Sequence, residues 1–174
     1  MILYPKVYLD SVLEITPELL EENNISGIIL DVDNTLMDKK KNMPKGVKEW
    51  LDNLKEKGYK ICIVSNTSKV EKVKSTANYL DLPYFYLSLK PLKRNLKKAK
   101  KLLEIEDSNR IAVVGDQVFT DVLGANRAKM FSILVKPISS EDIWVTVLNR
   151  KLEKHVLKRY MKKQKKNKIT KKEN

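Results

Sequence analysis

Histidine and cysteine are almost absent from this chain of 174 residues, which contains one of each. The single Cys62 allows no internal disulfide and no cysteine-based metal site. It lies within the apolar run 59–64, where a cysteine is expected to be a small buried hydrophobe rather than a reactive thiol. Because the lone His155 stands in a lysine-rich tail, we expect neither a histidine metal site nor a histidine-activated nucleophile.

Long hydrophobic runs are also missing, since no stretch approaches the ~20 apolar residues that span a bilayer. Residues 1–6 show no basic segment followed by a long apolar one, so no secretion signal is predicted. There is no internal repeat and no linker rich in glycine and serine. We therefore expect a cytoplasmic protein with one domain and a sizeable core.

The net charge of +13 is concentrated at one end of the chain. Residues 150–174 contain 12 Lys or Arg and two Glu, whereas the preceding 149 residues contain 23 basic and 20 acidic groups. The sequence thus predicts a nearly balanced domain over residues 1–150 and a basic extension over 151–174. We expect the extension to begin as a helix that continues from 141–160 and to become disordered beyond about residue 161.

Short apolar runs alternate with helical patterns along the whole domain. Helices are expected after Thr16, after Pro44, over 69–80, after Pro91 and over 119–129. Strands are expected at about 26–30, 59–64, 84–87, 111–114 and 131–135. This alternation predicts an α/β fold with a doubly wound, Rossmann-like parallel sheet.

Polar residues stand where four of these strands end. They are Asp31 and Asp33, then Ser65 and Asn66, then Lys90, then Gly115 and Asp116 with Asp121 close behind. Taken singly, each has an ordinary alternative as a helix cap, a solvated lysine or a tight turn. Because parallel strands end at one edge of a sheet, we expect them to meet there, and a cluster of like charges requires a reason.

A divalent cation and a phosphate supply that reason. Mg²⁺ prefers oxygen ligands, which Asp31 and Asp116 can provide, and it offsets the repulsion between them. Because side chains alternate along an extended segment, Asp31 and Asp33 point to opposite sides of their chain. One carboxylate can then attack phosphorus while the other handles a proton.

Four motifs carry a resemblance to the haloacid dehalogenase (HAD) superfamily. They are Asp31-Val32-Asp33-Asn34-Thr35-Leu36, Ser65-Asn66, Lys90-Pro91 and the segment Gly115–Asp121, in the order in which that superfamily has them. The resemblance implies a HAD-like fold and a Mg²⁺-dependent phosphatase in which Asp31 is the nucleophile and a metal ligand. It implies that Asp33 is the general acid and base and binds metal through its carbonyl.

The same resemblance assigns the other motif residues. It implies that Ser65 and Asn66 bind the substrate phosphate, that Lys90 steadies the phosphoryl-enzyme and that Asp116 completes the metal site. Asp121 is expected around the metal ligands rather than among them. Over roughly residues 1–150 the chain is similar to the YqeG-type HAD phosphatases, which include mitochondrial phosphatidylglycerophosphate (PGP) phosphatases. The segment Thr120–Arg127 is part of this finer match.

The spacing of the motifs leaves no room for a cap domain. Only residues 37–43 separate the first motif from the helix after Pro44, and the second and third motifs enclose a helix and a short strand. An open site admits a phosphate carried on something bulky. We expect PGP as the substrate; the alternatives are a phosphatase of nucleotides, polynucleotide ends or phosphoproteins, and a non-catalytic binding module.

The basic extension does not decide among these partners by itself. Clustered lysines draw a protein to anionic lipid headgroups, and they also bind nucleic acid or simply keep a surface solvated. Tyr160 is the only aromatic residue in residues 150–174, so a base-stacking platform is not indicated. We therefore favour peripheral contact with an anionic membrane surface and keep nucleic acid as the alternative.

Overall fold

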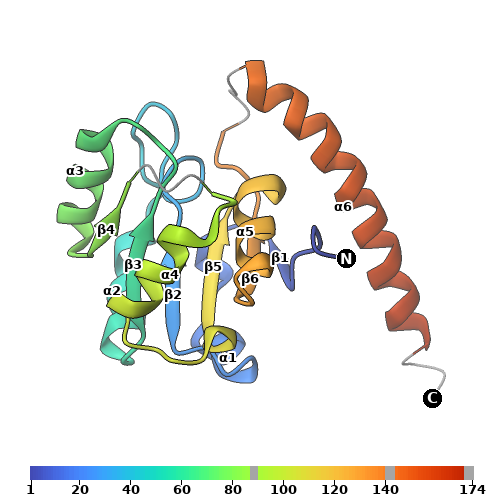
Figure 1. Ribbon diagram of the computed structural model, residues 1–174, viewed down its shortest axis with the longest axis horizontal. Helices are drawn as coiled ribbons and strands as arrows, with labels where there is room; N and C mark the ends of the chain where they lie inside the picture. Colours follow the sequence, from blue (N-terminus) through green and yellow to red (C-terminus); the bar gives the residue numbers. More distant parts are fainter. Residues whose placement is uncertain (87–89, 140–143, 171–174) are drawn as a thin grey trace.

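A six-stranded parallel sheet forms the centre of the molecule, with the strand order β1-β6-β5-β2-β3-β4 (Figure 1). The computed structural model describes residues 1–86, 90–139 and 144–170. The strands are β1 (Val7–Leu9), β2 (Gly27–Leu30), β3 (Lys60–Val64), β4 (Tyr84–Phe85), β5 (Ile111–Gly115) and β6 (Phe131–Val135). The main helices are α1 (Pro17–Glu22), α2 (Val47–Glu56), α3 (Val70–Leu80), α4 (Lys93–Leu102), α5 (Leu123–Arg127) and α6 (Trp144–Thr170).

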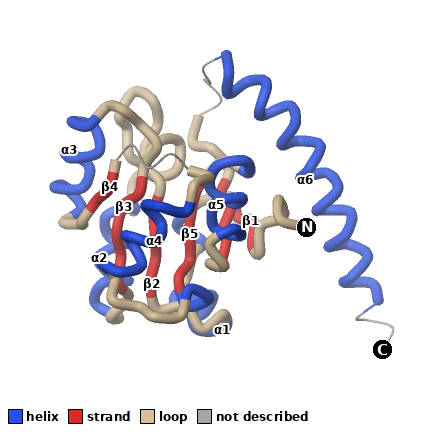
Figure 2. Tube along the Cα trace, viewed as in Figure 1, coloured by secondary structure: helices blue, strands red, loops and turns tan. Residues whose placement is uncertain are grey.

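Helices cover both faces of the sheet, so the fold is the predicted doubly wound α/β architecture (Figure 2). Alternation along β2 sends Ile28 and Leu30 to the core under α1, α2 and α3, and sends Ile29 to the core under α4 and α5. Strands buried on both faces read as continuous apolar runs, which is why these segments could be found in the sequence.

No extra domain is inserted in residues 31–46 or 65–69, which follow β2 and β3. Between Asn66 and Lys90 the described residues form only α3 and β4. After β2 and β3, the carboxyl edge of the sheet therefore carries short loops, as the sequence predicted. No helix in the described part of the chain is both long enough and apolar enough to cross a membrane.

Two elements differ from the sequence-based expectation. The edge strand β1 was not predicted; it has only three residues, and pairing with β6 defines it. Disorder is expected beyond about residue 161, and α6 is described there as far as Thr170; the expected domain boundary at 150 falls inside the same helix. Lysine and glutamine are good helix formers, so a helix that is docked over residues 153–160 propagates onward at little cost.

Candidate active site

The register of the central strands brings two of the predicted acids together. Leu30 of β2 pairs with Val114 of β5, and the Asp31 amide donates to the Val114 carbonyl at 2.9 Å. Asp31 and Asp116 thus leave neighbouring strands at the same edge of the sheet, and both are buried. On the other side of β2, β3 delivers the buried Ser65 to this edge.

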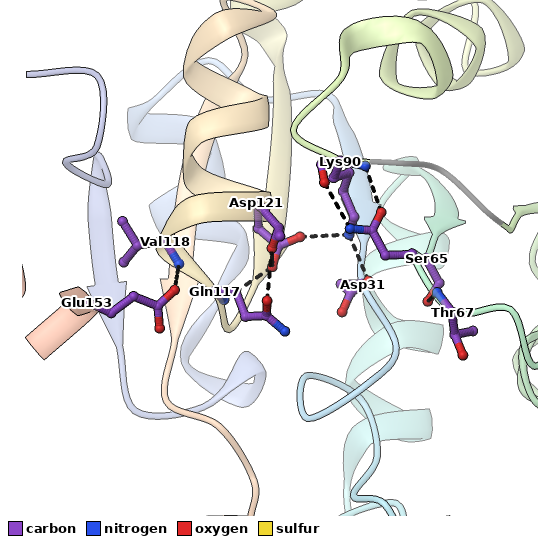
Figure 3. Close-up of polar contacts among 10 residues, drawn as sticks. Asp31, Ser65, Thr67, Lys90, Gln117, Val118, Asp121 and Glu153 are labelled. Atoms are coloured by element: carbon purple, nitrogen blue, oxygen red, sulfur yellow. Dashed lines mark hydrogen bonds and ion pairs between the residues drawn. The ribbon is translucent and has the colours of Figure 1, made fainter. Parts of the chain in front are cut away.

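Three buried carboxylates converge at this edge. Asp31, Asp116 and Asp121 each offer an oxygen, and these oxygens lie within 4.8 Å of one another. The Lys90 ammonium enters the group and lies 2.7 Å from Asp31 Oδ1 and 2.6 Å from Asp121 Oδ1 (Figure 3). When all four side chains are ionised, the cluster carries a net charge of −2 in a region almost closed to water.

The charges inside the cluster alter one another's protonation. Burial raises the pKa of Asp31 to about 7, with Lys90 opposing this shift and the Asp121 carboxylate adding to it. For Lys90, burial disfavours the ammonium, but the Asp121 and Asp31 carboxylates outweigh burial and raise its pKa. Oxygen donors with excess negative charge fit a hard divalent cation, which would favour the ionised form of Asp31 against burial and against the repulsion from Asp121.

Asp121 reaches the cluster through a tight local turn. It lies in the π-helical segment η3 (Val118–Val122), and its Oδ2 accepts from the Gln117 amide at 3.2 Å and from the Thr120 hydroxyl at 3.3 Å. A Cβ added to Gly115 would lie 2.1 Å from Asp121 Cγ. Glycine at 115 is therefore what allows the Asp121 carboxylate to pack against the end of β5.

The main chain of Lys90 is fixed by hydrogen bonds to Asn66, in addition to the ion pairs of its ammonium. Its amide donates to Asn66 Oδ1 at 2.8 Å, and Asn66 Nδ2 donates to the Lys90 carbonyl at 3.1 Å. Ser65 Oγ accepts from the Thr67 amide at 3.4 Å and stands at the same edge (Figure 3). Both ends of the Asn66 side chain thus contact the Lys90 backbone, and its role in phosphate binding stays a prediction.

Asp33 lies apart from the carboxylate cluster. Its side chain is 40% exposed and forms an ion pair with Lys72, a buried residue of α3. The Lys72 ammonium also donates to the Asp38 carbonyl at 3.3 Å, so it joins α3 to the loop that follows β2. This separation agrees with the alternation expected of Asp31 and Asp33, and it leaves the Asp33 side chain partly accessible to solvent.

Comparison with known proteins decides the family. A model of the family described as "Mitochondrial PGP phosphatase" matches residues 1–139. The chain is also 38% identical over 154 residues to "Probable phosphatase YqeG" of Bacillus subtilis, covering 88% of each chain. The chain belongs to the mitochondrial PGP phosphatase family.

A plant relative is named for the same activity as this PGP phosphatase family, and two solved structures share the fold. "Phosphatidylglycerophosphate phosphatase 1, chloroplastic/mitochondrial" of Arabidopsis thaliana is 26% identical over 160 residues; the match covers 84% of this chain but 44% of the plant protein. An uncharacterized protein from Listeria monocytogenes shares the fold with a TM-score of 0.55 at 22% identity, over 68% of this chain and 85% of that one. The cobalt-bound deoxy-D-mannose-octulosonate 8-phosphate phosphatase of Haemophilus influenzae gives 0.51 at 19% identity, over 67% and 70%.

The predicted resemblance to the YqeG-type and PGP phosphatases is therefore confirmed, and this PGP phosphatase family member is a phosphatase. The structure brings together five of the predicted residues, namely Asp31, Ser65, Asn66, Lys90 and Asp116, and it adds Asp121 to the acidic cluster itself. The Asp121 oxygen lies within 4.8 Å of those of Asp31 and Asp116, and the expected place of Asp121 around the metal ligands stays a prediction.

Two residues that contact the candidate active site, Lys72 and Glu153, were not predicted from the sequence. Lys72 lies one residue before Val73 and four before Thr76, on the buried side of α3, and a lysine within an otherwise apolar stripe is a signal that could have been used. Glu153 of α6 contacts the segment that carries Asp121. It is one of two acidic residues among the 12 basic residues of 150–174. Nothing in the local pattern indicates its partner.

Proposed function

We propose that the chain is a Mg²⁺-dependent phosphomonoesterase that acts through an aspartyl-phosphate on Asp31, with PGP as its substrate. The observation that carries this proposal is the buried cluster of Asp31, Asp116 and Asp121 around the Lys90 ammonium. Asp31 and Asp116 would hold the cation through carboxylates and Asp33 through its carbonyl oxygen. When bound, the cation would neutralise negative charge on the phosphoryl oxygens.

The proposed chemistry has two steps. An Asp31 carboxylate oxygen forms a bond to phosphorus while the bond from phosphorus to the alcohol oxygen breaks, and Asp33 gives that oxygen a proton. Water then attacks the phosphorus of the aspartyl-phosphate, Asp33 takes its proton, and inorganic phosphate leaves with Asp31 restored. Ser65 and the amides near Asn66 hold phosphoryl oxygens, and Lys90 stabilises the charge that gathers on Asp31 and the phosphate.

Support for a lipid substrate comes from three features. The family and the plant relative are named for PGP. After β2 and β3 the carboxyl edge carries only short loops, and Lys93 and Arg94 at the start of α4 are exposed close to Lys90 in the chain. The helix α6 is strongly basic; over residues 152–165 its exposed Lys and Arg residues are Lys154, Lys158, Arg159, Lys162, Lys163 and Lys165.

Exposed apolar side chains accompany these charges. Leu152 and Met161 of α6 are 54% and 46% exposed, and Leu92 before α4 is 51% exposed. Cations attract a protein to anionic headgroups, and apolar side chains enter the interface between headgroup and acyl chain. We propose that α6 and the start of α4 rest on an anionic membrane surface.

A phosphate-release assay tests the substrate. PGP in mixed micelles is compared with a nucleotide and a 5′-phosphorylated oligonucleotide, each with Mg²⁺ and with EDTA. We expect Mg²⁺-dependent release from PGP in the wild type and none from the Asp31→Asn variant. Release from the oligonucleotide without release from PGP would establish the alternative substrate class, and substantial turnover by Asp31→Asn would remove Asp31 as the nucleophile.

Vesicle sedimentation tests the membrane surface separately. The double variant Lys158→Glu/Lys162→Glu should lose binding to vesicles that contain anionic lipid. The control, Lys57→Glu/Arg110→Glu, changes the net charge equally, but its residues are exposed next to the starts of β3 and β5, at the other edge of the sheet. Equal loss in both variants would mean that total charge, rather than α6, governs binding.

A further inference from the structure

A carboxylate of the C-terminal helix is buried against the catalytic domain. Glu153 of α6 is only 4% exposed, and its Oε1 accepts from the Val118 amide at 2.6 Å (Figure 3). The same Oε1 accepts from the Phe119 amide at 3.4 Å. Its neighbours Leu152 and Lys154 are exposed. Burying a carboxylate costs several kcal/mol unless hydrogen bonds compensate, and here two main-chain amides supply them.

These amides belong to the segment that carries the acidic cluster. They open η3, and the first amides of a helix have no partner within the helix itself. The preceding amide, that of Gln117, donates to Asp121. Two carboxylates therefore hold three consecutive amides between Asp116 and Asp121: Asp121 holds the first and Glu153 of α6 holds the other two.

Apolar packing fixes the direction from which Glu153 approaches. Val156 and Leu157 of α6 pack against the buried Val118, Val122 and Leu134. One turn further, the buried Tyr160 meets Tyr4 edge to face at 5.7 Å between ring centroids. Glu153, Leu157 and Tyr160 recur at helical spacing, so a single face of α6 docks on the domain and directs the carboxylate to η3.

We propose that Glu153 is a positioning residue for the acidic cluster, which makes α6 a part of the active site rather than an appended tail. By holding the Val118 and Phe119 amides, Glu153 sets the path of the chain between Asp116 and Asp121 and hence the spacing of their carboxylates. This inference rests on the proposed divalent-cation site. It lies outside residues 1–139, over which the family is matched.

Calorimetric titration with Mn²⁺ in place of Mg²⁺ tests the positioning role of Glu153 without a substrate. Glu153→Ala should weaken Mn²⁺ binding ~10-fold, the lower end of the effect of losing a residue that orients metal ligands. Glu153→Gln keeps an acceptor oxygen and should recover most of that loss. Lys154→Ala, on the exposed side of the same helix, should bind Mn²⁺ like the wild type.

The Mn²⁺ titration distinguishes failure of the positioning role of Glu153 from failure of the proposed cation site. No Mn²⁺ binding by the wild type would refute the cation site and this inference together. Wild-type binding with unchanged affinity in Glu153→Ala, even with a lower melting temperature, would refute only the positioning role and leave Glu153 as a fold stabiliser.

The wild-type chain gives an answer even if Glu153→Ala does not fold. Coupling between two sites is reciprocal, so Mg²⁺ should slow hydrogen exchange at the Val118 and Phe119 amides, whereas peptides from α2 should be unaffected. Unchanged exchange at Val118 and Phe119 on saturation with Mg²⁺ would overturn the inference.

Discussion

Asn66 and Lys90 hold each other through a reciprocal pair of hydrogen bonds. The Lys90 amide donates to Asn66 Oδ1 at 2.8 Å, and Asn66 Nδ2 donates to the Lys90 carbonyl at 3.1 Å. The pair ties the loop after β3 to the segment before α4, across 24 residues of chain. It fixes the backbone from which the Lys90 ammonium reaches Asp31 and Asp121.

Replacement of Asn66 by alanine should therefore disturb Lys90. We expect Asn66→Ala to lower the free energy of unfolding by about 1–3 kcal/mol, for two lost hydrogen bonds. Turnover should fall roughly 10- to 100-fold because the ammonium is displaced from its productive position. Urea unfolding and phosphate release measure the two effects, with the exposed α2 variant Asn53→Ala as control. Unchanged turnover would show that Lys90 does not depend on Asn66.

The raised pKa of Asp31 predicts an unusual pH dependence for the metal-free protein. Folded Asp31 keeps its proton to about pH 7, whereas the unfolded chain releases it near 3.8. The folded state binds more protons between these values, so this carboxyl makes the free energy of unfolding fall as pH rises from about 4 to about 7.

Urea unfolding in EDTA between pH 4.5 and 8 measures this effect as the difference between the wild type and Asp31→Asn. The variant should be more stable than the wild type at pH 8, by about 1–4 kcal/mol, and the difference should shrink toward pH 4.5. The exposed Asp10→Asn serves as control. Mg²⁺ should stabilise the wild type at pH 8 by binding only the folded state. A difference that is independent of pH would contradict the buried, protonated carboxyl.

Gly115 at the end of β5 and Gly124 in α5 allow a matched pair of alanine substitutions. Gly115→Ala places a Cβ 2.1 Å from Asp121 Cγ, so Asp121 must leave its position, and activity and cation binding should be lost. Gly124→Ala lies in α5, where its Cβ would meet Leu96 and Pro91 at 3.5 Å, an ordinary contact. It should fold normally and gain roughly 0.5–1 kcal/mol from helix propensity. Melting curves and Mn²⁺ titration check both. Wild-type cation affinity in Gly115→Ala would show that Asp121 is not needed at the cluster.

Lys72 should support proton transfer by Asp33. Lys72→Met keeps the length of the buried side chain but removes the ion pair to Asp33 and the hydrogen bond to the Asp38 carbonyl. We expect kcat to fall roughly 10-fold with little change in KM, because Asp33 is oriented for a step that follows binding. Steady-state kinetics of Lys72→Met and of the exposed α3 variant Lys74→Met provide the comparison. A change confined to KM would place Lys72 in substrate binding instead.

The sequence by itself determined the buried strands, the edge of the sheet at which the site residues meet, and the family. The runs at 27–30, 60–64 and 111–115 are apolar at every position but Lys60 and the terminal glycines, because parallel strands are buried on both faces, and this signal is local. Parallel strands end at one edge, so Asp31, Ser65, Lys90 and Asp116 could be placed together before any coordinates were known. The motifs then indicated a YqeG-type phosphatase, a group that includes PGP phosphatases, and the family match confirmed this resemblance.

Only the tertiary structure decided which partner each of these residues has. The entry of Asp121 into the cluster depends on the absence of a side chain at Gly115, and the pairing of Asp33 with Lys72 depends on how α3 packs. The helix beyond residue 161 and the contact of Glu153 with η3 depend on docking between segments more than 30 residues apart. The periodicity of the sequence does not identify the partners in such contacts, because their energy comes from surfaces that meet only in the folded chain.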